Sequence, residues 1–284
     1  MRLRHDILRF PEGRTKAFTL SYDDGVIQDK RLIALFDQYG VKGTFNLNSG
    51  AFGQADQYSH LKVQHCKLPA DDILQVYQNH EIACHTVHHP DLAALPSNTI
   101  LYEVVTDRQN LEEMSGRIVR GMAYPFGTFN ATVKDMIRNA GILYSRTVRK
   151  THDFSIPSDF LEWNPTCHHD DPELLHLAKS FIEPETSNRL PKTKLFYVWG
   201  HAYEFDNNQN WNVMEDLLKL VSGHSDVWYA TNIQIAEYVE AASQLRYSAD
   251  GMMIFNPTCR DIWMNILDKD YCLKSGEMTR IIRD

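Results

Sequence analysis

The sequence predicts an α/β fold, namely a distorted (β/α)7 barrel-like fold followed by a small C-terminal β appendage. Apolar, β-favouring runs alternate along the chain with runs that have helical spacing. The strand-like runs are almost continuously apolar, which is typical of parallel strands covered on both faces. Titratable residues follow several different strands, and this favours barrel-like closure, because barrels gather the loops at the carboxyl ends of their strands.

Each predicted strand is followed by a helix or a loop. Strands are expected at residues 17–22, 41–47, 81–84, 118–123, 142–148, 195–200 and 227–231. Helices are expected at residues 26–39, 69–80, 97–115, 130–140, 212–221 and 233–245, with one more opening at Pro172. Residues 51–68 and 150–171 are polar and irregular, which predicts two long loops. We expect residues 1–245 to form the barrel and residues 246–284 to form the β-rich appendage, packed on the same domain.

Composition excludes several classes of protein. A chain of 284 residues that is 43% hydrophobic can bury a large core. The formal net charge of −8 disfavours nucleic acid or an anionic membrane as the main partner, and no apolar run is long enough to span a bilayer. The five cysteines are scattered without a CxxC pair, and no apolar segment typical of a signal peptide follows the first residues. These features predict a cytoplasmic location.

The first strand ends in Ser-Tyr-Asp-Asp-Gly, residues 21–25. Asp23 and Asp24 repel one another at the end of a buried strand, so their charge must be compensated. A metal ion bound by one carboxylate, with the other left as a base, would compensate it. A turn that leads into a solvated helix start is the alternative explanation of this stretch.

Histidines follow two other predicted strands. His85 and His89 come after the third strand, and His201 comes after the sixth. One carboxylate and two imidazoles can form a three-ligand site for a divalent metal with an open position for water. Taken singly, each histidine could equally be an ordinary hydrogen-bonded side chain. A helical zinc-protease motif is disfavoured, because Thr86 stands where that motif needs Glu and Pro90 interrupts a helix.

Four stretches taken together resemble the polysaccharide deacetylase family, also called carbohydrate esterase family four or the nodulation-protein-B homology domain. The resemblance covers residues 18–231, and residues 42–45 also resemble the family's second strand. The four stretches are Ser-Tyr-Asp-Asp-Gly at 21–25, His-Thr-Val-His-His-Pro at 85–90, Tyr-Pro-Phe-Gly at 124–127 and the late strand that ends in His201.

The resemblance implies roles for these residues. Asp23 would be the general base, and His201 would be the general acid that protonates the leaving amine. Asp24, His85 and His89 would hold one divalent metal ion, which polarises the acetyl carbonyl. The backbone N–H near Phe126 would help to bind the oxyanion. Zinc suits this ligand set best, while cobalt, nickel, manganese and ferrous iron are also compatible with it.

The chain departs from the family pattern at two places. Ala123 stands where members usually carry an arginine that steadies the base, and Arg146 lies in the right layer to replace that arginine. The family's fourth-motif Asp-Trp pair has no clear counterpart, although Trp163 is a candidate. Further candidates to line the substrate site are Tyr124, His168 and Tyr203.

The resemblance therefore predicts a metal-dependent hydrolase that removes acetyl groups from an N- or O-acetylated sugar or oligosaccharide. Two alternatives remain open at the level of the sequence. One is the same fold and metal site acting on a non-sugar amide, since the loops at the strand ends set specificity. The other is a carbohydrate-binding protein that has lost catalysis. The sequence leaves the identity of the sugar, the native metal and the oligomeric state open.

Overall fold

A curled parallel sheet forms the centre of the protein in this computed structural model, which describes residues 6–184 and 192–282. Its strands lie in the order β8-β7-β6-β3-β2-β10-β9, and β11 pairs with β2 off this path. These strands are β2 (Lys16–Asp23), β3 (Gly43–Leu47), β6 (Glu81–Cys84), β7 (Gly121–Ala123), β8 (Tyr144–Arg146), β9 (Cys167–His168), β10 (Lys194–Gly200) and β11 (Val227–Tyr229). The predicted seven strands are all present, and β9 is an additional short strand within the second predicted loop.

Strand β2 lies in the middle of the sheet. It pairs with β10 along almost its full length, from Lys16 opposite Lys194 to Tyr22 opposite Gly200. Its other edge carries β11 at the beginning and β3 at the end. Because all these pairings are parallel, the carboxyl ends of the strands meet at one rim of the sheet.

One segment bridges the two outer edges of the sheet. The backbone N–H of Trp163 donates to the carbonyl of Ser145 on β8, at 3.0 Å. Three residues later the N–H of Thr166 donates to the carbonyl of Tyr197 on β10, at 2.8 Å. The segment between β8 and β9 thus gives the curled sheet its barrel-like closure.

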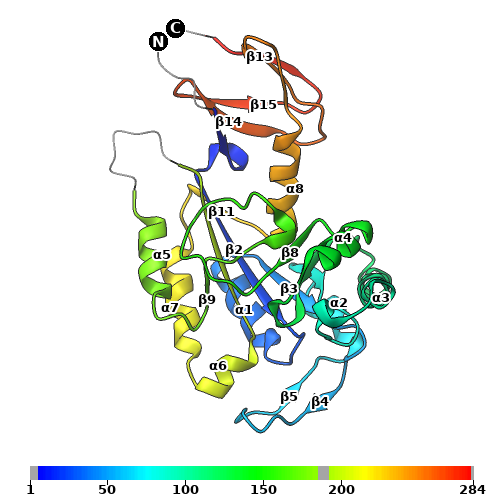
Figure 1. Cartoon of the computed structure of the whole chain (residues 1–284). Helices are drawn as coiled ribbons and strands as arrows, with labels where there is room; N and C mark the ends of the chain where they lie inside the picture. Colours follow the sequence, from blue (N-terminus) through cyan, green and yellow to red (C-terminus); the bar gives the residue numbers. More distant parts are fainter. Residues whose placement is uncertain (1–5, 185–191, 283–284) are drawn as a thin grey trace.

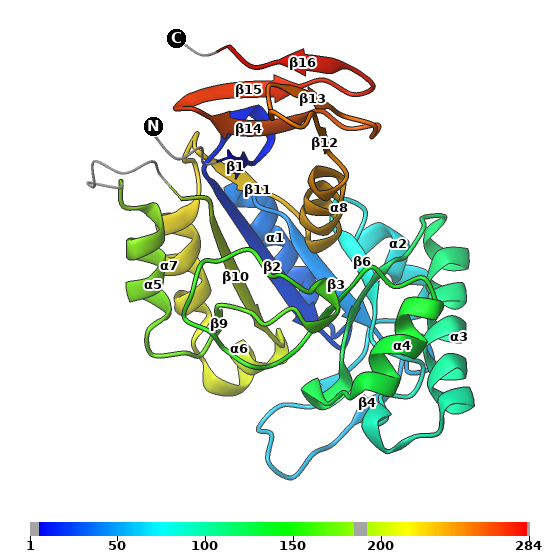
Figure 2. The same ribbon diagram turned by 45° about the horizontal axis from the view of Figure 1, so that its top comes forward.

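Helices cover the outer face of the sheet, except the last one, Asn232–Ser243, which lies beside the small C-terminal sheets (Figures 1 and 2). Their bounds are α1 (Asp29–Tyr39), α2 (Ile73–Val76), α3 (Ser97–Ser115), α4 (Ala131–Asn139), α5 (Leu174–Ile182), α6 (Tyr203–Asn208), α7 (Trp211–Val221) and α8 (Asn232–Ser243). Alternation along β2 separates the two faces, since Phe18, Leu20 and Tyr22 belong to the large outer core. Thr19 and Ser21 point to the opposite face and hydrogen-bond Asn232 and Asn46. The inner face is therefore polar.

Two small antiparallel sheets lie at the end of the molecule opposite the hairpin of β4 (Ala55–Asp56) and β5 (His65–Cys66) (Figures 1 and 2). The first sheet has the order β1-β14-β15 and the second has the order β12-β13-β16. Their bounds are β1 (Asp6–Arg9), β12 (Arg246–Tyr247), β13 (Met253–Phe255), β14 (Ile262–Ile266), β15 (Lys269–Leu273) and β16 (Met278–Arg280). The predicted C-terminal β appendage is thus present, and it also incorporates a strand from near the start of the chain.

The structure differs from the sequence-based expectation in three further places. Residues 51–68 contain the β4–β5 hairpin, whose two-residue strands are too short to produce an alternating pattern. The helix expected at 69–80 is reduced to a short turn and α2, and α6 occupies a stretch for which no helix was expected. Among the helices of residues 6–184 and 192–282, none is both long enough and apolar enough to cross a membrane.

Candidate active site

A cavity of about 730 Å³ opens at the carboxyl-end rim of the sheet. It brings together eight of the residues predicted from the sequence, and these are Asp23, Asp24, His85, His89, Tyr124, Phe126, His201 and Tyr203. Trp199 and the hairpin residues Tyr58 and His65 line it as well. Arg146 lies beneath the cavity and is completely buried. Trp163 and His168 do not line it.

Asp23 ends β2 on the inner face and is held by two donors. Arg146 donates to its Oδ2 through a guanidinium N–H, and Asn46 Nδ2 donates to its Oδ1 at 2.8 Å. The guanidinium of Arg146 also lies 4.1 Å from the centre of the Trp199 ring. Burial alone would raise the pKa of Asp23, but Arg146 and the nearby imidazoles of His85 and His201 outweigh it and lower that pKa. Asp23 is therefore an ionised carboxylate in fixed orientation.

The carboxylate of Asp24 has two partners that differ from those of Asp23. Lys67 Nζ donates to Asp24 Oδ1 at 3.0 Å, and His65 Nε2 lies 3.2 Å from Asp24 Oδ2. Burial opposes ionisation, yet Lys67 and His65 lower the pKa of Asp24 well below its ordinary value. Both partners come from the β4–β5 hairpin and the residues directly after it, a segment in which no motif predicts a functional residue.

Asp24, His85 and His89 form a set that fits a divalent metal ion. One ligand atom from each lies within 4.8 Å of the others. His85 Nδ1 lies 2.8 Å from the carbonyl oxygen of Ala123 and donates to it, which leaves the lone pair of Nε2 free for a ligand bond. Burial lowers the pKa of His85 to about 4 and also lowers that of His89, so both imidazoles are neutral near pH 7. Neutral imidazoles and an ionised carboxylate are the donor set of hydrolytic zinc sites.

Backbone strain is concentrated at this rim. Four residues other than glycine have positive φ angles there, and these are Asp24 at 83°, Thr86 at 67°, His89 at 56° and Phe126 at 58°. Such conformations cost free energy and persist where the surrounding structure enforces them, often at functional sites. The ring of Phe126, which is 63% exposed, packs edge-on against His89 with centroids 4.6 Å apart.

A buried carboxyl that the sequence did not reveal supports His85. Asp107 on α3 accepts hydrogen bonds from the backbone N–H of His85 at 3.0 Å and of Ser49 at 2.8 Å. Burial raises the pKa of Asp107 to about 7. Asp107 thus fixes the loop after β6 to the loop after β3, although a single acid inside an amphipathic helix carries no sequence signal for such a role.

His201 approaches Asp23 from the end of β10. Its Nε2 lies 3.9 Å from Asp23 Oδ2, and its Nδ1 lies 3.3 Å from Glu204 Oε1. Burial would lower the pKa of His201, but Glu204, Asp23 and Asp24 together raise it to about 9. The site therefore holds an ionised carboxylate and a protonated imidazole side by side, an arrangement suited to general base and general acid chemistry.

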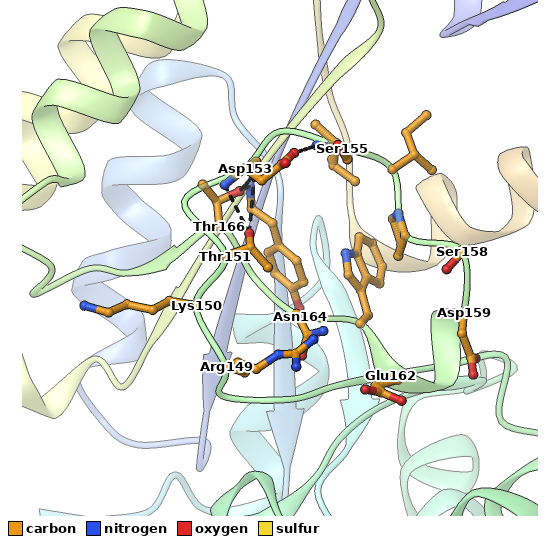
Figure 3. Close-up of a pocket in the computed structure, with 15 residues that line it drawn as sticks. Arg149, Lys150, Thr151, Asp153, Ser155, Ser158, Asp159, Glu162, Asn164 and Thr166 are labelled. Carbon is orange, nitrogen blue, oxygen red and sulfur yellow. Dashed lines mark hydrogen bonds between the residues drawn. The ribbon is translucent and has the colours of Figure 1, made fainter.

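Trp163 and His168 have other surroundings. Trp163 is buried between Tyr144 and Tyr197 and lines a second cavity, of about 710 Å³. Figure 3 shows the loop of residues 149–166 running around that cavity, with Arg149 and Asn164 among the residues that line it. The ring of His168 lies next to that of His201, with centroids 6.4 Å apart, and its Nε2 is 3.2 Å from Glu204 Oε2. Trp199, rather than Trp163, is the tryptophan that borders the candidate active site.

Comparisons with known proteins agree with this fold. The family model described as polysaccharide deacetylase matches residues 11–145. A chitin deacetylase from Pestalotiopsis sp is 27% identical over 125 residues, which are 44% of this chain and 39% of that relative. The match thus spans well under half of the relative's length.

Two solved structures are similar in their chain path. A Mycobacterium smegmatis protein assigned to the polysaccharide deacetylases is 18% identical, with a TM-score of 0.58 over 84% of this chain and 94% of that one. A family 4 carbohydrate esterase from Streptomyces lividans is 13% identical, with a TM-score of 0.49 over 76% of this chain and 93% of that one. The Mycobacterium protein therefore shares the fold. The chain therefore carries the sequence pattern of the polysaccharide deacetylase family in residues 11–145 and shares the fold of the Mycobacterium protein.

Proposed function

We propose that this protein is a metal-dependent hydrolase that removes acetyl groups from an N- or O-acetylated carbohydrate. The observation that carries the proposal is the pair of Asp23 and His201, 3.9 Å apart beside a three-residue metal-ligand set. The match of residues 11–145 to the polysaccharide deacetylase family model and the similarity to a chitin deacetylase support a carbohydrate substrate.

In the proposed mechanism Asp24, His85 and His89 hold the divalent ion. When bound, such an ion polarises the acetyl carbonyl and lowers the pKa of water. Zinc fits two imidazoles and a carboxylate, and cobalt, nickel, manganese or ferrous iron would fit the same donors.

The remaining steps fall to the chain's own side chains. Asp23 takes the proton of the attacking water, because Arg146 and Asn46 keep it ionised and oriented. The backbone N–H of Phe126 would donate to the developing oxyanion. His201 then gives its proton to the departing amine or alcohol, since an amine leaves poorly unless it is protonated. Tyr124 and Tyr203 are proposed to contact the sugar, because they line the same cavity.

The first test combines metal analysis with acetate release. We expect about one equivalent of divalent metal in the purified or reconstituted protein and its loss in the His85→Ala/His89→Ala double variant. His88→Ala is the matched control for metal content, because His88 Nδ1 pairs with Glu103 and its side chain is largely exposed.

Acetate release is then measured on N-acetylated chito-oligosaccharides and O-acetylated xylo-oligosaccharides, with a panel of non-sugar amides alongside. The proposal expects turnover of an acetylated sugar that disappears with the metal. Turnover of the non-sugar amides alone would move the activity to another C–N bond. A metal-loaded protein that is inert on every substrate would favour a binding protein.

A further inference from the structure

The carboxylate of Glu204 lies among three imidazoles. Its Oε1 is 3.3 Å from Nδ1 of His201, and its Oε2 is 3.2 Å from Nε2 of His168 and 3.2 Å from Nε2 of His169. One negative charge can be fully compensated by one positive charge. The chemistry of the cluster therefore depends on which imidazole carries the proton.

His168 is held as a neutral donor. Its Nδ1 accepts the backbone N–H of Asp170 at 3.1 Å, so Nδ1 carries no proton. The proton of the neutral ring is consequently on Nε2, which faces Glu204. Protonation of Nδ1 would break the bond to the backbone of Asp170.

His169 is held neutral by burial. Its ring is stacked between Tyr22 and Phe205, with centroid distances of 5.7 and 4.2 Å, and it has no solvent exposure. Burial lowers the pKa of His169 well below the ordinary value. The ring also packs directly on Gly200, where an added Cβ would come within 2.0 Å of Nδ1 of His169. The charge of Glu204 is therefore left to His201.

The tautomer of His168 also argues against a second metal site. Ligand atoms of His168, His201 and Glu204 do lie within 4.8 Å of one another. A ligating histidine, however, normally donates its other ring N–H to an acceptor, as His85 does to the carbonyl of Ala123. In His168 the corresponding nitrogen accepts a hydrogen bond, which leaves the second nitrogen as a donor.

Glu204 holds both the backbone and the ring of His201. Its Oε2 accepts the backbone N–H of His201 at 3.1 Å, across the turn that leads into α6. Its Oε1 pairs with Nδ1 of the same residue. With Nδ1 beside the carboxylate of Glu204, Nε2 faces Asp23 at the reaction centre.

We propose that Glu204 is a positioning residue for the acid of the reaction: it keeps His201 protonated with Nε2 turned to the substrate, while the neutral N–H of His168 keeps Glu204 ionised. This inference rests on the proposed function, because it assigns His201 a proton to deliver.

The inference predicts a change in the pH profile. His201 must be protonated to act, so activity is lost as the pH rises through its pKa, which lies at about 9. In Glu204→Gln the compensating anion is gone, and we expect the alkaline limb to move down by about 1–3 pH units. At pH 8.5 this corresponds to a loss of kcat of about 3-fold for a shift of one unit and about 200-fold for a shift of three units. KM should change little, because Glu204 does not line the cavity.

Other charged and titratable groups that face His201 remain in place in this variant. They are Asp23 and Asp24 at the end of β2, His89 after β6, His168 and His169 at the end of β9, and Tyr203 on α6. Glu173→Gln is the matched control, because its exposed side chain removes the same charge from the loop after β9.

The decisive measurement is the titration of the His201 Cε1 proton by NMR in the zinc-loaded protein, with the resonance assigned by a His201→Gln variant. The pKa of His201 should be the same in the wild type and in Glu173→Gln, and at least one unit lower in Glu204→Gln. In Glu204→Asp it should lie in between, because the shorter aspartate side chain keeps the negative charge but places it farther from His201. Thermal unfolding verifies that each variant is folded. If Glu204→Gln is not folded, the comparison of Glu204→Asp with the wild type provides the test.

An unchanged His201 titration in Glu204→Gln, or equal titration of the Gln and Asp variants, would overturn the inference. A wild-type protein that releases no acetate from any sugar would instead defeat the proposed function. The NMR titration would still decide the role of Glu204 in that case, so the two failures are distinguishable.

Discussion

Arg146 takes the place of the arginine that is expected at position 123 as the charged partner of Asp23. Ala123 on β7 leaves no side chain to steady Asp23, and Arg146 on the neighbouring strand β8 reaches the same carboxylate. The guanidinium has no solvent exposure and lies against the ring of Trp199. Removing one partner of such a buried pair leaves an uncompensated charge, which is strongly unfavourable.

Arg146→Met tests this compensation. We expect kcat/KM to fall by about 10²-fold or more, because an unpaired, buried Asp23 regains its proton and no longer acts as a base. Metal content should not change, because Arg146 contacts Asp23 and not the three metal ligands. Arg149→Met, three residues along the chain at the second cavity, should behave as wild type. Normal activity of Arg146→Met would remove Arg146 from the mechanism.

At the scale of elements, a buried carboxyl on β6 connects several elements through hydrogen bonds at the polar inner face of the sheet. Glu81 accepts hydrogen bonds from the hydroxyls of Thr44 at 2.8 Å and Tyr144 at 2.6 Å, and from the backbone N–H of Ile233 at 2.9 Å. Burial raises its pKa to about 7, although the three donors oppose the shift. Glu81 therefore links β3, β8 and the start of α8 beneath the candidate active site.

Tyr144→Phe should lower the free energy of unfolding by about 1–3 kcal/mol, because it leaves an oxygen of Glu81 buried without its donor. The folded pKa of Glu81 lies above its unfolded value of about 4.3, so Glu81 destabilises the fold increasingly as the pH rises from that value toward 7. Loss of a donor raises the folded pKa further, and the penalty should be larger at pH 8 than at pH 5. Urea unfolding at both pH values measures this, with the exposed Tyr102→Phe as control. Equal losses at both pH values would contradict the role of Glu81.

The order of strands and helices could be predicted from the sequence, because long apolar runs and helical spacing are local signals. The ends of the strands could be predicted too, and with them the positions of Asp23, His85 and His201. The contacts of Lys67 and His65 with Asp24 could not, because they lie in or just after a hairpin whose strands are two residues long. Such contacts arise only when the hairpin folds back over the rim of the sheet.

At the scale of the whole molecule, the C-terminal strands are tied to the barrel by the start of the chain. Strand β1 pairs with β14, and the hydroxyl of Tyr238 on α8 joins them by donating to the carbonyl of Arg9 and accepting the N–H of Trp263. Ile262 and Phe10 are completely buried in one core cluster that also contains residues of β2 and β10. We therefore propose that residues 246–284 fold as part of the same unit as the barrel.

Ile262→Ala tests that unity. Deleting a fully buried isoleucine side chain should cost about 2–5 kcal/mol. If the appendage and the barrel unfold together, the whole loss appears in one urea transition, with the same midpoint by far-UV circular dichroism and by tryptophan fluorescence. Ile282→Ala, at a position that is 67% exposed, should leave that midpoint unchanged. A separate early transition in Ile262→Ala, followed by unfolding of the barrel at the wild-type midpoint, would show that the two parts unfold independently. If they share one core, the substitution must lower the stability of both parts.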